Sequence, residues 1–157
     1  MKIYKSPEST IAAVGPRIFL AGSIEMGKAI DWQTKISNDL SGYVGSIFNP
    51  RRDDWDSSWV QSASNAKFNE QVTWEMNNLD VATHIVFYFD PKTQSPITLL
   101  ELGLMATTRK KIFMYCPEGF WRRGNVEMVC NKYSIKMYDT YDELVTAVVN
   151  SVSPTNK

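Results

Sequence analysis

The sequence predicts one α/β domain whose sheet is doubly wound, mostly parallel and five-stranded. A length of 157 residues matches the usual size of a single domain. Short apolar runs alternate with helix-length amphipathic segments, which is typical of a parallel sheet covered by helices on both faces. The run 84–89 is apolar without alternation, as expected of a central strand buried on both faces. No repeat or linker interrupts the pattern, so residues 1–157 are expected to form a single domain.

The first half of the chain is expected to supply three strands and two helices. The run 17–21 is the first strand, and the segment 26–40 follows it as a helix. A short second strand covers 44–48 and is closed by a proline, because the residue before a proline avoids helical geometry. A helix at 65–81 then leads into the central strand at 84–89. The inward residues are expected to be Ile30, Ile36 and Leu40 in the first helix and Phe68, Val72, Met76 and Leu79 in the second.

The second half begins with a helix signalled by Ser95 and Pro96 and running to about residue 108. A serine can cap the free amide groups, and proline suits the first helical position. Thr140 and Glu143 form the capping-box pattern ahead of a last helix ending near residue 149, and the tail 151–157 is expected to fray. Between the helix that begins near residue 96 and this last helix, we expect a strand at 111–116, a short helix at 125–131 and a weaker fifth strand at 134–138.

Composition and charge exclude several classes of function. Lys and Arg together number 17 and so do Asp and Glu, which indicates no basic surface for nucleic acid or for an anionic membrane. No apolar run approaches the roughly 20 residues of a membrane span, and the first residues lack the apolar segment of a leader, so a cytoplasmic location is expected. Cys116 and Cys130 are expected to be reduced thiols. The expected partner is a small molecule.

Glu101 is the strongest single signal for a functional site. It is the one ionisable residue in the segment 96–106, which is apolar nearly all round and is therefore expected to be buried. An ionised carboxylate in such surroundings is costly unless it is paired or hydrogen-bonded. Glu101 is therefore either satisfied by an arginine or by loop amides, or catalytic. The catalytic interpretation is preferred because perturbed carboxylates concentrate at functional sites.

Glu75 is the candidate for a second carboxylate. It shares one face of the 65–81 helix with Gln71 and Asn78, opposite the expected apolar stripe, and such a face is usually only solvated. The helix nevertheless leads into the central strand, which is followed by the segment that carries Glu101, so the two carboxylates can converge. Two carboxylates across one pocket suggest glycosidic-bond chemistry, with one as nucleophile and one as acid and base.

Candidates for ligand binding follow the strands, because ligands of such sheets bind beyond the carboxyl ends of the strands. Trp55 can stack on a planar ligand and Asp54 can accept hydrogen bonds from a base, or this loop is a solvated surface with Trp55 packed down. Gly22 permits close approach of a ligand, but its segment is neither GxGxxG nor a Walker A motif. His84 is expected to be a packed core residue. With no second histidine and no cysteine cluster, the sequence indicates no metal site.

Motifs spread over residues 17 to 139 carry a family resemblance. They are Phe-Leu-Ala-Gly-Ser-Ile at 19–24, Asn-Pro-Arg-Arg-Asp at 49–53, Trp-Glu at 74–75, Ser-Pro-Ile-Thr-Leu-Leu-Glu-Leu-Gly at 95–103 and Gly-Phe-Trp-Arg-Arg-Gly-Asn-Val at 119–126. In this order they resemble the nucleoside 2-deoxyribosyltransferase family, particularly its branch described as "like". The resemblance implies a flavodoxin-like fold and a homo-oligomeric enzyme of nucleoside salvage that needs no cofactor and no metal.

The resemblance also implies roles for individual residues. Glu101 would attack the anomeric carbon of a 2′-deoxynucleoside, expel the base and hold the sugar as a glycosyl-enzyme ester until a second free nucleobase takes it. Glu75 would be the acid and base or contact the nucleobase, although the family has an aspartate there. Asn125 would reach the sugar 5′-hydroxyl of a neighbouring subunit. Together with the residues that follow the strands, the candidate substrate-binding residues are Gly22, Ser23, Asn49, Asp54, Trp55, Ser95, where the family usually has a further carboxylate, and Asn125.

Two alternative functions remain open from the sequence. Relatives with similar sites hydrolyse the N-glycosidic bond of nucleoside 5′-monophosphates, and such a hydrolase would need a phosphate pocket, for which Ser23, Ser95 and the pair Arg51 and Arg52 are candidates. A non-catalytic sensor of a nucleotide-like ligand is the other alternative. The presence of two candidate catalytic carboxylates counts against a sensor, because a pure binder gains nothing from a desolvated nucleophile.

Overall fold

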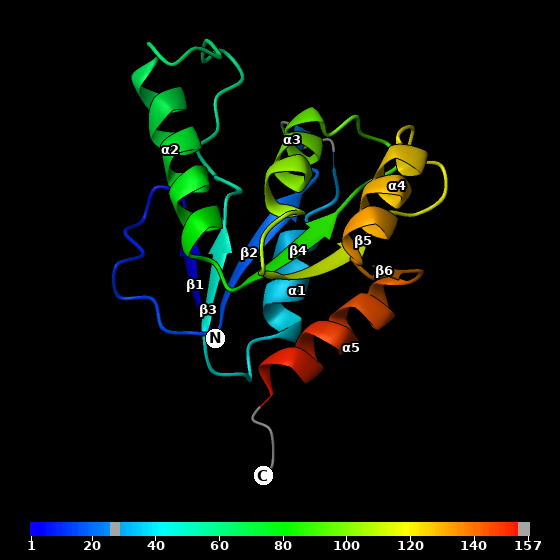
Figure 1. Cartoon of the computed structure of the whole chain (residues 1–157). Coiled ribbons are helices and arrows are strands. Elements are labelled where there is room, and N and C mark those ends of the chain that lie inside the picture. The colour runs from blue at the N-terminus through cyan, green and yellow to red at the C-terminus, as the bar shows by residue number, and fades with distance from the viewer. Residues whose placement is uncertain (26–28, 154–157) are drawn as a thin grey trace.

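The computed structural model describes residues 1–25 and 29–153 and has an α/β/α sandwich as its architecture (Figure 1). In the described part of the chain, six parallel strands form one sheet in the order β1-β3-β2-β4-β5-β6. The strands are β1 (Lys2–Lys5), β2 (Arg17–Gly22), β3 (Ser46–Asn49), β4 (His84–Tyr88), β5 (Lys111–Tyr115) and β6 (Met137–Tyr138). The helices are α1 (Trp32–Asp39), α2 (Ala66–Val81), α3 (Pro96–Met105), α4 (Arg123–Tyr133) and α5 (Tyr141–Val152).

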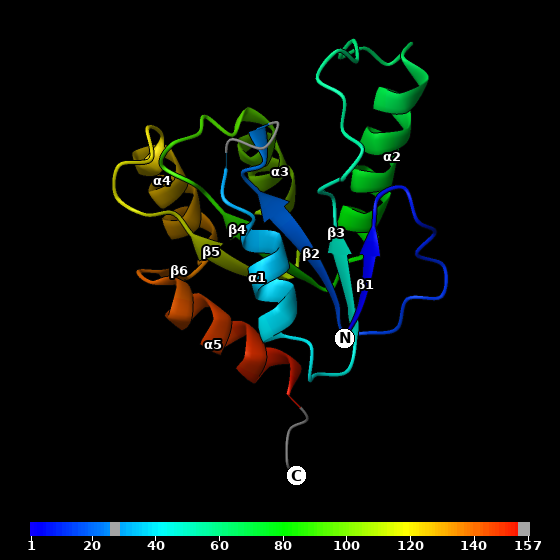
Figure 2. The ribbon, with the colours of Figure 1, turned by 180° about the vertical axis from the view of Figure 1, so that it is seen from behind.

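The five helices divide between the two faces of the sheet. Helices α2, α3 and α4 contribute to one apolar cluster, and α1 and α5 contribute to the other (Figures 1 and 2). Strand β4 is buried along its whole length, as its unbroken apolar run predicts. The sequence prediction of a doubly wound α/β fold with a parallel sheet is therefore confirmed.

The point where the strand order changes direction lies between β2 and β4. The chain passes from β2 to β3 on one side and then returns to β4 on the other, with Gly22 opposite Tyr88 at the carboxyl ends. Ligands of such folds bind in the crevice at this switch point. The helices that follow β3 and β4, α2 and α3, lie on the same face of the sheet and flank this position (Figure 1).

The predicted number of five strands is wrong because β1 was not expected. This strand has four residues and occupies the edge of the sheet, where it pairs with β3 from Lys2 opposite Ser46 to Lys5 opposite Asn49. Strand β1 is too short to show the alternation of apolar and polar residues that predicts a strand. It is held in the sheet by tertiary contacts. Tyr4 is buried and packs edge-on against Phe48 at a centroid distance of 6.1 Å.

Several predicted boundaries shift for local reasons. Helix α1 begins only at Trp32, which with Ile36 and Leu40 faces the core, whereas Ile30 precedes the helix and is exposed; residues 26–28 of the predicted helix lie outside the described residues. Strand β3 begins at Ser46, and Val44 is exposed. These exposed aliphatic residues extend the apolar pattern beyond the true elements.

The helix signals in the second half have mixed outcomes. The capping box of α5 is confirmed, since the Thr140 side chain accepts from the Glu143 amide and the Glu143 carboxylate accepts from the Thr140 amide. Helix α5 continues to Val152, so residues 151 and 152 are helical and the prediction that they fray is wrong. Ser95 does not cap α3 with its side chain and adopts a left-handed conformation with φ 48°.

The expected inward face of α2 is confirmed only at Leu79, since Phe68 and Val72 are half-buried and Met76 is exposed. Its buried residues are Gln71, Trp74, Asn78 and Leu79, and Met76 of the expected stripe is 56% exposed. The polar face is buried because the segment after β1 covers it. Thr10 donates to the Asn78 side chain at 2.7 Å, and the Trp74 indole donates to the Glu8 carbonyl at 2.8 Å.

Helix α3 is apolar nearly all round, but it is buried on one side only. Thr98, Glu101, Leu102 and Met105 face the protein, whereas Ile97, Leu100 and Leu104 are exposed. The expectation that the whole helix is buried is therefore wrong, although it holds for Glu101. Within the described residues, no helix is both long enough and apolar enough to cross a membrane.

Candidate active site

Glu101 is a buried carboxyl group without a protein partner. It lies in the second turn of α3, is 9% exposed and forms no hydrogen bond or ion pair with any residue that the structure describes. Removal from water disfavours its charged form, and the nearby charge of Glu75 acts in the same direction, so the pKa of Glu101 rises to about 8. The alternative that an arginine or loop amides satisfy this glutamate is not supported by these contacts.

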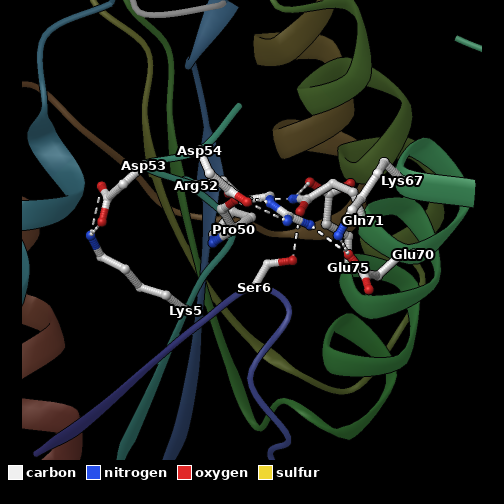
Figure 3. Close-up of polar contacts among 10 residues, drawn as sticks. All are labelled: Lys5, Ser6, Pro50, Arg52, Asp53, Asp54, Lys67, Glu70, Gln71 and Glu75. Atoms are coloured by element: carbon white, nitrogen blue, oxygen red, sulfur yellow. Dashed lines mark hydrogen bonds and ion pairs between the residues drawn. The ribbon is translucent and has the colours of Figure 1, made fainter. Parts of the chain in front are cut away.

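Glu75 approaches the same region from α2. Its Oε1 accepts a hydrogen bond of 2.8 Å from the Gln71 side-chain amide, one helical turn earlier (Figure 3). Burial raises the pKa of Glu75 to about 7, and the hydrogen bond from Gln71 partly opposes this rise because it stabilises the charged form. The tertiary structure thus turns a position on a polar helix face into a second perturbed carboxyl.

The two carboxyls form an electrostatically coupled pair, since the charge on Glu75 raises the pKa of Glu101. Ionisation of one disfavours ionisation of the other, so one member of the pair keeps its proton through neutral pH. A retaining glycosyl transfer requires this combination of one carboxylate that attacks and one carboxylic acid that gives a proton to the leaving group.

A cluster of buried hydroxyl groups lies at the switch point between β2 and β4. Ser23 Oγ lies 2.5 Å from Ser95 Oγ, and Thr93 Oγ1 lies 2.9 Å from Ser23 Oγ and 2.8 Å from Ser95 Oγ. Ser23 also accepts the Asp90 amide at 2.9 Å. The structure therefore brings the predicted residues Ser23 and Ser95 together, with their hydroxyls bonded to each other.

Glu25 completes this end of the sheet. Its Oε1 accepts the backbone amide of Ser95 at 2.6 Å and that of Gln94, so a carboxylate binds the loop directly before α3. The side-chain cap that Ser95 was expected to provide is not formed. Glu25 belongs to none of the predicted functional positions, and its one sequence signal is its place directly after β2.

The loop after β3 is organised around Arg52, whose side chain is almost completely buried. Arg52 pairs with both oxygens of Asp54 at 2.8 and 2.9 Å and with Glu70 of α2 at 3.0 Å (Figure 3). Asp54 itself is exposed, and the guanidinium lowers its pKa to about 2. The Asp54 carboxylate is thus engaged by its own loop.

Trp55 and Asn49 also have contacts inside the protein. Trp55 is half-buried against Trp59 in an edge-on arrangement with ring centroids 5.0 Å apart, and its indole nitrogen is buried without a partner among the described residues. Asn49 is buried at the end of β3 and accepts the Arg51 amide at 2.9 Å. The stacking of Trp55 on a ligand stays a prediction.

The segment that holds both carboxyls and the hydroxyl cluster matches a known family. A family model described as nucleoside 2-deoxyribosyltransferase like matches residues 15–120, more than half of the chain. The chain belongs to the nucleoside 2-deoxyribosyltransferase-like family. The resemblance inferred from the motifs is thereby confirmed. No curated protein matches the sequence.

The family match does not cover the whole sandwich. Strand β1 precedes residue 15, and α4, β6 and α5 follow residue 120. Asn125 therefore lies outside the matched residues. It is exposed in the first turn of α4, where Arg122 is the N-cap, so the alternative that Asn125 caps this helix is wrong.

Gly22 is required by the packing of this chain. A Cβ at Gly22 would lie 2.5 Å from the Trp32 ring and 2.5 Å from the Tyr88 carbonyl oxygen, distances that real contacts do not reach. Trp32 and Tyr88 stack on each other at a centroid distance of 4.8 Å. The absence of a side chain at Gly22 is thus explained without a ligand, and its contact with a substrate stays a prediction.

A hollow of about 400 Å³ lies at the end of the sheet where the strands begin. Lys110, Lys111 and Ser134 contribute to its lining, together with Lys136 and Ser151. Lys111 begins β5, so this hollow lies at the amino ends of the strands, away from the switch point. Its position separates it from the two carboxyls and from the hydroxyl cluster.

Proposed function

We propose that this protein transfers a 2-deoxyribosyl group from one nucleobase to another by a retaining double displacement, as an enzyme of cytoplasmic nucleoside salvage. The observation that carries the proposal is the coupled pair of carboxyls, Glu101 buried without a protein partner and Glu75 half-buried. Membership of the nucleoside 2-deoxyribosyltransferase-like family supports the substrate class.

In the first half-reaction, a Glu101 oxygen attacks the anomeric carbon of a 2′-deoxynucleoside. The bond from this carbon to the base nitrogen breaks, its electron pair goes to the base, and Glu75 gives the base a proton. The sugar remains as an ester on Glu101. In the second half-reaction a new base attacks the same carbon, its proton passes to Glu75, and Glu101 leaves as a carboxylate.

The reaction needs the shared proton on Glu75. In the free protein burial raises the pKa of both carboxyls, to about 7 for Glu75 and about 8 for Glu101, and the hydrogen bond from Gln71 opposes the rise at Glu75. A nucleobase nitrogen that accepts a hydrogen bond from Glu75 favours the protonated form of that carboxyl. Binding of the nucleobase would therefore move the negative charge to Glu101, where the attack takes place.

The contacts at the switch point favour a nucleoside over a nucleoside 5′-monophosphate. A phosphate needs free hydrogen-bond donors or cations. The hydroxyls of Ser23 and Ser95 are bonded within their cluster, and the Glu25 carboxylate binds backbone amides directly before α3. Arg51 and Arg52 bind protein groups. These contacts make hydrolysis of monophosphates the weaker candidate.

We also propose that a second copy of the chain completes each site. Ile97, Leu100 and Leu104 form an exposed apolar strip at helical spacing on the outer side of α3. Asn125 and Trp121 are exposed at the start of α4, and the Trp121 indole donates to the Gln94 carbonyl just before α3 at 2.9 Å. This surface would be buried by the neighbouring copy, and Asn125 would donate to the sugar 5′-hydroxyl of that copy.

Incubation with a 2′-deoxynucleoside, with and without a second free base, tests the activity by chromatography. A new nucleoside that forms only with the second base supports transfer, whereas free sugar alone indicates hydrolysis, and binding without turnover indicates a sensor.

A slow 2-fluoro substrate is expected to label the peptide that carries Glu101. Labelling of another residue would contradict the mechanism, and the exposed Glu118→Gln serves as the control variant.

Complementation tests the shared site. Glu101→Ala and Asn125→Ala are each expected to be inactive, and mixed oligomers reassembled from both are expected to regain activity, because some sites receive an intact residue from each chain. Mixed oligomers that stay as inactive as the separate variants, with subunit exchange verified, would place Asn125 outside its neighbour's site.

A further inference from the structure

The segment that follows β1 runs along the polar face of α2 and meets it at three positions. Besides the contacts of Glu8 and Thr10 described above, the Ser6 hydroxyl donates to Gln71 Oε1 at 2.5 Å. The segment's partners share one face of α2; they are Gln71, Trp74 and Asn78. Of these three contacts, the one at Gln71 reaches a residue that also binds Glu75.

The Gln71 side chain has every polar position occupied. Its nitrogen donates to the Pro50 carbonyl at 2.9 Å and to Glu75 Oε1 at 2.8 Å, while its oxygen accepts from Ser6 (Figure 3). Gln71 is 4% exposed and Ser6 6% exposed, so water does not compete freely for these groups.

The three partners select one orientation of the amide. If the amide were flipped, its oxygen would face the Pro50 carbonyl and the Glu75 carboxylate, which are both acceptors. The Ser6 hydroxyl supplies the donor that the amide oxygen needs, and the two N–H groups then point to the two acceptors. The orientation is thus fixed by groups directly after β1, directly after β3 and within α2 itself.

We propose that the N-terminal strand is part of the machinery of the site, with Ser6 and Gln71 as positioning residues that direct an N–H group at the Glu75 carboxylate. This inference rests on the proposed role of Glu75. Strand β1 lies outside the residues that the family model matches. Its pairing with β3 in the register of Lys5 opposite Asn49 brings Ser6 beside Pro50 and so to Gln71.

The hydrogen bonds that run from Ser6 through Gln71 to Glu75 form a relay, which controls which carboxyl carries the charge. The N–H group of Gln71 stabilises the charged form of Glu75, and the charge of Glu75 opposes ionisation of Glu101 across the pair. Loss of the relay is therefore expected to move the two groups in opposite directions. The pKa of Glu75 would rise and that of Glu101 would fall, a pattern that a merely structural role would not produce.

NMR titration of the carboxyl carbons in the free protein tests this, with Glu75→Gln and Glu101→Gln used to assign the two signals. Gln71→Leu is expected to raise the pKa of Glu75 by about one unit, the size of one hydrogen bond to a charged group. Ser6→Ala is expected to shift it in the same direction by less, and Ser6→Thr, which keeps the hydroxyl, to restore the wild-type value. Thr10→Val removes the parallel contact to Asn78 and is the matched control, with both pKa values unchanged.

In Ser6→Ala, Gln71 is still present to donate to the Pro50 carbonyl and to Glu75. This variant therefore gives a result even if Gln71→Leu does not fold. Unchanged pKa values of both carboxyls in folded Gln71→Leu and Ser6→Ala, or an equal shift in Thr10→Val, would overturn the inference. The titration needs no turnover, so it is independent of the proposed function: shifted pKa values in a protein without transfer activity would refute the function and leave the relay standing. In active protein, the pH profile of kcat/KM is expected to shift with the pKa of Glu75.

Discussion

Replacing Glu101 by glutamine should make the protein less active and, at alkaline pH, more stable. The ordinary pKa of the carboxyl is 4.5, and burial raises it to about 8 in the folded protein. The folded state therefore holds the proton more tightly than the unfolded state. Stability from this group is fully present below pH 4.5 and is lost as the pH rises towards 8.

The size of the stability change follows from the difference between the ordinary pKa of Glu101 and its pKa in the folded protein. At about 1.4 kcal/mol per pKa unit, the difference between 4.5 and about 8 corresponds to at most about 5 kcal/mol of lost stability. Glutamine does not titrate, so Glu101→Gln should gain up to about 4 kcal/mol relative to wild type between pH 5 and pH 8, or about 8–16 °C in Tm. Transfer activity should fall at least about a thousandfold, because covalent catalysis fails without the nucleophile.

Urea unfolding followed by tryptophan fluorescence at pH 5, 6, 7 and 8 measures the effect. The wild-type protein, Glu101→Gln and the exposed control Glu118→Gln should be compared, and only Glu101→Gln should flatten the decline towards pH 8. Equal slopes for wild type and Glu101→Gln would refute the reasoning, because they would mean that Glu101 titrates alike in the folded and unfolded states.

Three other substitutions test separate parts of the structure. Glu75→Gln should slow poor leaving groups more than activated ones, and equal losses in a comparison of nucleosides would exclude a role as acid. Trp55→Ala should raise KM several-fold by weakening base stacking, with a smaller effect on hydrolysis of the sugar-enzyme ester; an unchanged KM would return Trp55 to a packing role. Gly22→Ala should cost about 3 kcal/mol in urea unfolding, since its Cβ would overlap the Tyr88 carbonyl. Gly124→Ala is its control, because a Cβ there meets no described atom within 4 Å, and equal losses in both would contradict the overlap.

The alternation of apolar runs and amphipathic segments was sufficient to predict the parallel sheet and its covering helices. These signals are local: strand β4 is recognisable from its own apolar residues, and α5 starts at a capping box contained within four residues. The buried carboxyl of Glu101 was also predictable, because a single charge in an apolar segment is costly wherever the segment packs. Local chemistry of this kind needs no knowledge of distant parts of the chain.

Which side of α2 faces inward was decided by the tertiary structure alone. Apolar and polar residues are mixed around this helix, so either face can be buried if a partner satisfies it. The partner is the short segment after β1, in which Ser6 binds Gln71 across 65 positions of the chain. Burial of that polar face perturbs Glu75 and gives it a fixed donor. The sequence therefore determined the sheet apart from β1 and one carboxyl of the pair. The edge strand and the second carboxyl took their places through contacts that only the folded chain brings together.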